Sequence, residues 1–404
     1  MIEIYDKTRC CGCNACGDVC PHHAIHFEMD NEGFYYPYVK KELCVNCGMC
    51  NRICPMNRVN ELIKKQYDVP KCYAGYNKNI NERLESTSGG IFSLLAKKMY
   101  RMGGYVGGAI YTDDFSVISF ISNNEEDLQN LRKSKYIQGT SFEYYKTIKR
   151  LLDNQEKVLV CGLPCQMAAL KSFLGKEYNN LLTVDILCKT CNSPRVFHKY
   201  LQDLENKYKG EVISVKERYK KAGWRSLTRE IKFNNGKVYY GRGYKDSFQR
   251  GFQLNIFSRP SCYLCRFKTI PRIGDITLGD FWGIEKLDIS LDDNKGTSLI
   301  CINNDKGYNY FIKITDNMIQ KSVSFDNVCK GNIAAFTGKG NNYPTNIDRE
   351  VFFQNIDSLP FEKVANEFFP YSPLPIKSKI RKVLGKMIIP VKHCLSYIYT
   401  DLSH

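Results

Sequence analysis

The central part of the chain alternates two hydrophobic patterns. Short apolar and β-branched runs predict buried strands at 72–76, 105–111, 157–161 and 181–187. Apolar residues that recur every three or four positions predict helices at 91–102, 143–152, 166–174 and 196–208. Strands that alternate with helices are typical of an α/β fold, so we expect an α/β body with a largely parallel sheet over residues 71–345.

Two other stretches alternate apolar and polar residues about a turn and predict β-hairpins. One covers 26–40 with its turn at Asn31-Glu32-Gly33, and the other covers 227–240 with its turn at Asn234-Asn235-Gly236. Residues 58–70 are polar and charged for much of their length and are expected to link an N-terminal domain, 1–57, to the body.

The C-terminal region, 346–404, ends in a basic amphipathic pattern. From Ile376 onward, apolar residues at helical spacing are interleaved with Lys and Arg, and Pro390 would kink the helix. We expect this helical tail to pack on the body. The alternative is that it lies on an anionic membrane surface.

Composition indicates a globular protein with two or three domains. The chain has 404 residues, of which 43% are hydrophobic and 25% are charged. No apolar run approaches the roughly 18 residues of a spanning helix, and the N-terminus lacks the pattern of an export signal. We therefore expect a cytoplasmic protein, in which the 19 cysteines favour metal ligation or catalysis over disulfides.

The N-terminal cysteines form an internal repeat of C-x2-C-x2-C-x3-C-P. The first repeat, 10–21, superposes on the second repeat, 44–55, after a shift of 34 residues, and Cys11 is the one cysteine out of register, opposite Val45. This spacing is that of bacterial two-cluster ferredoxins, in which the fourth cysteine of each run ligates the other [4Fe-4S] cluster. The predicted first set of ligands is therefore Cys10, Cys13, Cys16 and Cys54, and the predicted second set is Cys44, Cys47, Cys50 and Cys20.

The alternative is a pair of zinc sites. Structural zinc prefers two separated cysteine pairs in a tetrahedral arrangement, and a tight triple followed by a distant Cys-Pro fits this poorly. We therefore expect an α+β ferredoxin-like iron–sulfur domain at residues 1–57.

The body carries further cysteines and one loop of small residues. Cys262 and Cys265 form a C-x2-C pair, which in a reducing compartment usually binds a metal or cluster. The loop Ser88-Gly89-Gly90 leads directly into the helix predicted at 91–102. It is either an anion site at a helix N-terminus or an ordinary N-cap with flexible glycines.

Five stretches of the body occur in an order that resembles the coenzyme F420 hydrogenase/dehydrogenase beta-subunit family. They are Ser88-Gly89-Gly90-Ile91-Phe92-Ser93, Ser134-Lys135-Tyr136-Ile137-Gln138, Gly162-Leu163-Pro164-Cys165-Gln166, Ser261-Cys262-Tyr263-Leu264-Cys265 and Asp275-Ile276-Thr277-Leu278-Gly279-Asp280-Phe281-Trp282-Gly283. The resemblance runs from about Cys72 to Gly307. One departure is Cys188-Lys189-Thr190, where the family commonly has Cys-His-Gly, so any role of that histidine is absent here.

The resemblance implies FAD and a third iron–sulfur cluster in the body. Ser88, Gly89, Gly90 and Lys135 are the expected contacts of the FAD phosphates. Cys165 and Cys188 follow neighbouring predicted strands and would emerge at one edge of the sheet. The resemblance favours Cys188 over Cys191, so the expected body set of ligands is Cys165, Cys188, Cys262 and Cys265.

Charge and the expected cofactors together limit the partners. The formal net charge is +16, and three clusters with FAD would reduce the excess to roughly +8. A basic surface suits an acidic ferredoxin or another anionic partner, and no nucleic-acid recognition module is visible. The expected redox partner is a ferredoxin, a deazaflavin or nicotinamide carrier, or a partner enzyme, with a polysaccharide-related small molecule as a candidate substrate.

Two function classes follow. In the first, the chain is a FAD-dependent iron–sulfur oxidoreductase that passes electrons between clusters and a hydride carrier or organic substrate. In the second, it is an electron-transfer subunit that has no substrate of its own and serves a partner enzyme.

Overall fold

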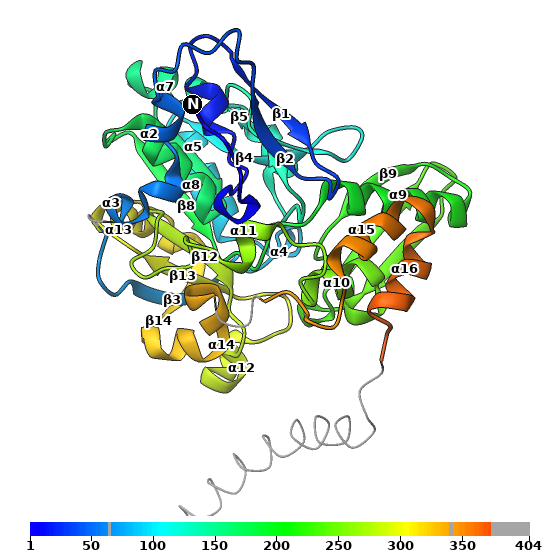
Figure 1. Cartoon of the computed structure of the whole chain (residues 1–404). Helices are drawn as coiled ribbons and strands as arrows, with labels where there is room; N and C mark the ends of the chain where they lie inside the picture. Colours follow the sequence, from blue (N-terminus) through cyan, green and yellow to red (C-terminus); the bar gives the residue numbers. More distant parts are fainter. Residues whose placement is uncertain (64–65, 339–341, 373–404) are drawn as a thin grey trace, which may run out of the picture.

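The computed structural model describes residues 1–63, 66–338 and 342–372 (Figure 1). Its centre is a nine-stranded sheet in the order β14-β3-β13-β12-β8-β7-β4-β5-β6. The strands are β3 (Lys71–Asn77), β4 (Tyr105–Tyr111), β5 (Val117–Ser122), β6 (Gly139–Thr140), β7 (Val158–Gly162), β8 (Leu181–Ile186), β12 (Ile276–Asp280), β13 (Ser298–Ile302) and β14 (Met318–Val323). All four strands predicted for the body are present, which confirms the α/β body.

The sheet is mixed, so the expectation of a largely parallel sheet is wrong. The pairs β4–β7, β7–β8, β8–β12 and β5–β6 are parallel, whereas β4–β5, β12–β13, β3–β13 and β3–β14 are antiparallel. A helix connects β7 to β8 and permits the parallel crossover that the pattern predicts. A tight turn at 112–116 joins β4 to β5 and can join only antiparallel neighbours.

Helices cover both faces of this sheet. Val158 and Val160 of β7 pack against α7 (Tyr144–Asp153) and α8 (Pro164–Leu174), while Leu159 points to the opposite face and packs with α5 (Ile91–Arg101). The second face is completed by α13 (Asp305–Phe311) and η8 (Ile312–Asn317). The strand β7 is therefore buried on both sides, which explains its continuous apolar run.

A second, smaller layer lies beside the main sheet (Figure 1). The strands β9 (Val212–Lys216), β10 (Thr228–Phe233) and β11 (Val238–Arg242) form an antiparallel sheet, and β10 and β11 confirm the predicted second hairpin. An aromatic-rich core joins these strands to four helices. They are α9 (Pro194–Tyr208), α10 (Ser247–Gln253), α15 (Arg349–Ser358) and α16 (Phe361–Phe368).

The N-terminal residues pack against the main body (Figure 1). The hairpin of β1 (Ile25–Met29) and β2 (Tyr35–Val39) confirms the first predicted hairpin, and short helices α1 (Ala15–Asp18) and α2 (Met49–Arg52) flank it in sequence. Within the expected linker, α3 (Val59–Leu62) packs on α8 and buries Val59. The chain therefore leaves the N-terminal domain along the body surface.

The predicted basic helix beginning near Ile376 lies outside the described residues, so its expected packing stays a prediction. In the described part of the chain, no helix combines the length and the apolar character needed to cross a membrane.

Candidate electron-transfer site

The cysteine repeat is also a repeat in structure. Each half has a residue with positive φ just before a one-turn helix: Asn14 (φ 66°) precedes α1, and Gly48 (φ 74°) precedes α2. The third cysteine of each run, Cys16 or Cys50, lies inside that helix and is buried. Ile2 packs against both thiols in one small apolar cluster, so the two repeats meet at their helices.

The structure brings the first set of predicted ligands together. Cys10, Cys13, Cys16 and Cys54 line one small cavity, which Ile2, Phe27 and Pro55 also border. Burial raises the pKa of Cys16, and the neighbouring thiols Cys13, Cys10 and Cys54 raise it further. A bound metal reverses this preference by stabilising the thiolate. The four residues therefore border one small, partly open cavity, which Cys11 also lines.

The second set of predicted ligands lies nearer the surface. Cys50 is buried beside Cys16, whereas Cys47 is exposed and Cys20 and Cys44 are half-buried. The Cys44 thiol donates a hydrogen bond to Asn46 Oδ1 at 3.8 Å. This set therefore has one side against the first set and one side toward solvent.

The four body cysteines also come together, at the edge predicted from the strand order. Cys165 follows β7, Cys188 follows β8, and these two strands are parallel neighbours. Burial raises the pKa of Cys188, with further increases from Cys262 and Cys265, and Cys165 interacts with the same three thiols. The rival Cys191 contributes its backbone N–H, which donates to Cys262 Sγ at 3.4 Å.

Cys11, the cysteine that falls outside the repeat register, joins the first set to the body set. Its thiol lies close enough to Cys13 and Cys165 for each to influence its pKa, and all three residues pack against the same hydrophobic core. Repeat spacing predicts that Cys11 is not a ligand but carries no information about its long-range neighbour. The contact makes the two groups of thiols immediate neighbours.

Polar contacts hold the first repeat against α7. The Asp18 carboxylate accepts hydrogen bonds from the backbone N–H groups of Glu143 (2.8 Å) and Tyr145 (2.9 Å) at the start of that helix. Tyr145 in turn donates its hydroxyl to the carbonyl of Cys13 at 2.8 Å. Because Asp18 is 5% exposed, this contact is an enclosed cap of the α7 N-terminus.

The described residues contain no site for a single metal ion. Across residues 1–63, 66–338 and 342–372, no three His, Cys, Asp or Glu side chains are arranged to hold one metal ion.

The structure brings the predicted flavin contacts near one another. For two of them, Gly89 and Lys135, packing or hydrogen bonding within the protein already accounts for the residue type. A side chain on Gly89 would place Cβ 2.5 Å from the carbonyl of Gly75 and 2.8 Å from Ser298 N, so sheet packing alone requires glycine. The Lys135 side-chain amine donates hydrogen bonds to the carbonyls of Asn130 and Arg132, and burial lowers its pKa to about 7. Gly90 precedes α5 with φ 84°.

Three of the five stretches that resemble the family, 88–93, 134–138 and 275–283, converge beside these residues. Ser134 N donates to Thr87 Oγ1 at 3.1 Å, and Ser88 Oγ donates to the carbonyl of Thr297 at 3.0 Å and to that of Gly279 at 3.4 Å. Lys133 and Arg218 also belong to this region, although no sequence pattern predicted them as site residues. Lys133 is one position outside a quoted stretch, and Arg218 follows β9 with no local pattern that marks it.

Lys133 and Arg218 have buried side-chain nitrogens for which the structure gives no well-oriented hydrogen-bond acceptor. These atoms are Lys133 Nζ and Arg218 Nε and Nη2. Lys133 lies 3.2 Å from Glu85, and burial lowers its pKa despite that carboxylate. Arg218 pairs with Asp280 through Nη1 at 2.7 Å and lies over the Trp282 ring. For an anionic ligand, Arg218 offers two buried donors without an acceptor, and Lys133 offers a buried ammonium whose ion-pair partner is Glu85.

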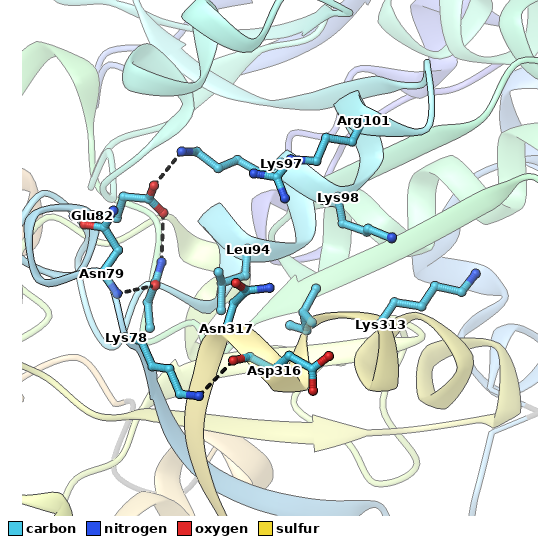
Figure 2. Close-up of a pocket in the computed structure, with 12 residues that line it drawn as sticks. Lys78, Asn79, Glu82, Leu94, Lys97, Lys98, Arg101, Lys313, Asp316 and Asn317 are labelled. Atoms are coloured by element: carbon cyan, nitrogen blue, oxygen red, sulfur yellow. Dashed lines mark hydrogen bonds and ion pairs between the residues drawn. The ribbon is translucent and has the colours of Figure 1, made fainter.

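A cavity of about 460 Å³ lies elsewhere on the body, between α5 and η8 (Figure 2). Its lining is rich in cations, of which Lys97 pairs with Glu82 at 2.5 Å and Lys78 donates to the carbonyl of Asp316 at 2.8 Å. Neither the cysteine sets nor the predicted flavin contacts line it.

Comparison with known proteins agrees with this two-part organisation. Residues 9–58 match the 4Fe-4S dicluster domain, and residues 155–326 match the family described as the C terminus of the coenzyme F420 hydrogenase/dehydrogenase beta subunit. No curated protein matches the chain. Among solved structures, a chain of the F420-reducing [NiFe] hydrogenase complex from Methanosarcina barkeri is similar at 17% identity. The match covers 76% of this chain and 93% of that chain, with a TM-score of 0.45.

The dicluster match agrees with the repeat and implies two [4Fe-4S] clusters. The second match begins before β7 and spans the stretches that hold Cys165, Cys188, Cys262 and Cys265. The chain thus carries a segment that matches the 4Fe-4S dicluster domain, followed by a longer segment that matches the C terminus of the coenzyme F420 hydrogenase/dehydrogenase beta subunit.

Proposed function

We propose that this protein is a FAD-dependent iron–sulfur oxidoreductase in which three [4Fe-4S] clusters connect the protein surface to a flavin. The observation that carries the proposal is the Cys11 contact, which makes the first set and the body set neighbours. The first set also adjoins the second set where Cys16 and Cys50 pack together. The three sets thus follow one another without a break.

The order of the sets supports a path for single electrons. The second set includes the exposed Cys47 and is the natural point of exchange with a redox partner. The first set lies between the second set and the body set, which is enclosed by residues after β7 and β8. Electrons would therefore pass between partner and body through the first set.

The residues near Ser88 fit FAD. Arg218 offers buried donors without an acceptor and Lys133 offers a buried ammonium for its pyrophosphate, and Gly90 immediately precedes the 11-residue helix α5, whose first N–H groups favour an anion. Bound FAD would supply the conversion between single-electron and hydride transfer. Ser88, Gly89 and Lys135 would act by shaping this site, since their polar groups bond to neighbouring backbone and side chains.

A flavin-content measurement tests the FAD site. Lys133→Met combined with Arg218→Met should lose most extractable flavin and keep the iron of the wild type, because both changes lie outside the cysteine sets. Lys216→Met is the matched control, since Lys216 also approaches Glu85 (3.4 Å) but from a more exposed position. Full flavin occupancy in the double variant would remove the assignment.

The second candidate is an electron-transfer subunit without its own substrate, which the description of the matched family as a beta subunit favours. The two candidates differ in what the isolated chain can do. An enzyme would bleach its flavin with a small-molecule donor alone, such as a reduced deazaflavin or nicotinamide. A protein of the second kind would bleach only when its partner enzyme is added.

A further inference from the structure

Arg259 is a fully buried cation placed against the first set. It has 0% exposure and lies immediately before α11 (Pro260–Tyr263), the helix that carries Cys262. Its guanidinium reaches into the first repeat: Nε donates to the carbonyl of Cys10 at 2.8 Å, and Nη2 donates to Cys10 Sγ at 3.5 Å. One residue therefore touches the first set with its side chain and adjoins the body set through its backbone.

The other polar neighbours of this guanidinium are neutral. Nη1 donates to Gln138 Oε1 at 2.9 Å and Nη2 to the carbonyl of Tyr35 at 3.1 Å, while the Tyr36 ring lies 4.1 Å from the guanidinium carbon. Within the described residues, no carboxylate forms an ion pair with it. Arg229 and Arg272 are as deeply buried, and each is paired with an acid, Arg229 with Glu217 and Asp246, and Arg272 with Asp185.

Burying a charge without a counter-charge costs free energy, so we expect an anion to bind beside Arg259. A [4Fe-4S] cluster with four thiolates carries about −2 in its oxidised form and gains one further negative charge on reduction. We propose that Arg259 is the counter-charge of the first-set cluster and holds its reduction potential above that of the second-set cluster. The inference rests on the proposed cluster at Cys10, Cys13, Cys16 and Cys54.

The backbone of the first repeat is shaped to admit the guanidinium. Gly12 has φ 71°, and a Cβ there would lie 2.9 Å from Arg259 Cζ and 2.5 Å from Gln138 Nε2. The equivalent residue of the second repeat is Asn46, whose Oδ1 accepts from the Cys44 thiol. The two otherwise similar repeats thus place different groups beside their first cysteine: a buried cation in one and a neutral amide in the other. The cation that contacts the second repeat, Arg52, is exposed and donates to the carbonyl of Cys47 at 2.8 Å.

The direction of the effect follows from charge alone. The reduced cluster is more negative than the oxidised one, so a nearby fixed cation stabilises the reduced form more. Arginine remains protonated in proteins, so no proton needs to move with the electron. A first-set cluster that is easier to reduce than the second-set cluster draws electrons inward toward the body set.

The test is an anaerobic redox titration of the holoprotein, followed by electron paramagnetic resonance, with dithionite as reductant. Arg259→Gln should lower the potential of one cluster by at least about 59 mV, a tenfold change in its reduction equilibrium. Arg259→Lys keeps the charge and should restore part of the shift. Arg229→Lys, which alters a buried arginine away from the thiols, should leave every cluster potential unchanged.

Gln138→Glu keeps the inference testable if the Arg259 variants fail to fold. The new carboxylate would pair with Arg259 and cancel its charge, so the same cluster should again become harder to reduce. An unchanged potential in both Gln138→Glu and Arg259→Gln, with iron content equal to wild type, overturns the role of Arg259. Wild-type protein that lacks the first-set cluster overturns the proposed function itself, which is a separate result.

Discussion

The two cysteine repeats have the same spacing but different surroundings. In the first repeat, Ala15 is 0% exposed and Asp18 caps α7, whereas the equivalent residues of the second repeat are the half-buried Met49 and the exposed Arg52. Cys11 contacts the body through Cys165, and Val45, its counterpart, is 61% exposed. One repeat is thus part of the protein interior and the other part of its surface.

This difference assigns a direction to a nearly symmetric unit. A two-cluster domain alone has two similar ends, and either could face a partner. With the predicted ligands, burial of the first repeat against α7 and Arg259 would make its cluster the internal one, and the exposed Cys47 would make the second cluster the external one. The asymmetry comes from the residues between the cysteines, since the ligand spacing is equal.

The largest expected effect comes from removing a ligand of the first set. Cys10→Ser should lose about four iron atoms per chain, because it removes one thiolate of a cubic cluster, and should stop electron flow to the flavin. Cys11→Ser should keep the iron of the wild type, as should Val45→Ser at the equivalent position. Iron analysis after anaerobic purification measures this, and equal iron loss in Cys10→Ser and Cys11→Ser would show that the register is wrong.

Iron removal should occur in two phases. A chelator with a mild oxidant reaches the second-set cluster through the exposed Cys47, so the first phase should remove about four iron atoms, roughly tenfold faster than the rest. Iron release followed by absorbance and electron paramagnetic resonance gives the order. Simultaneous loss of all clusters would contradict the division into an external and an internal cluster.

The smallest expected effect concerns docking of the first repeat. Asp18→Ala should lower stability by about 1 kcal/mol, because it leaves two N–H groups at the start of α7 without their acceptor. Arg52→Ala, at the equivalent exposed position, should change stability by less than about 0.5 kcal/mol. Anaerobic thermal unfolding of both variants compares them, and an equal loss would mean that the cap contributes nothing.

Local patterns predicted a large part of this molecule. The strands at 105–111, 157–161 and 181–187 and the helices beside them are present because their apolar period records which faces are buried. The cysteine repeat predicted for a similar reason that Cys10, Cys13, Cys16 and Cys54 lie together, since spacing along the chain is a local property. The body set followed from strand order together with family resemblance.

Long-range features were not predictable in the same way. The antiparallel positions of β3, β13 and β14 depend on which edge each strand joins, and no periodicity records that choice. The roles of Cys11 and Arg259 depend on partners that lie far away in the chain. Gly89 was expected to face a ligand, but its small size is required by the sheet behind it.

In the proposed function, three clusters form a continuous path from the exposed second set to the body. The most direct test is iron and acid-labile sulfide analysis of anaerobically purified protein, with Mössbauer spectroscopy to identify the cluster type. We expect about 12 iron atoms per chain, all in [4Fe-4S] clusters, and about 8 in the Cys262→Ser variant. About 8 iron atoms in the wild type, unchanged by Cys262→Ser, would contradict it.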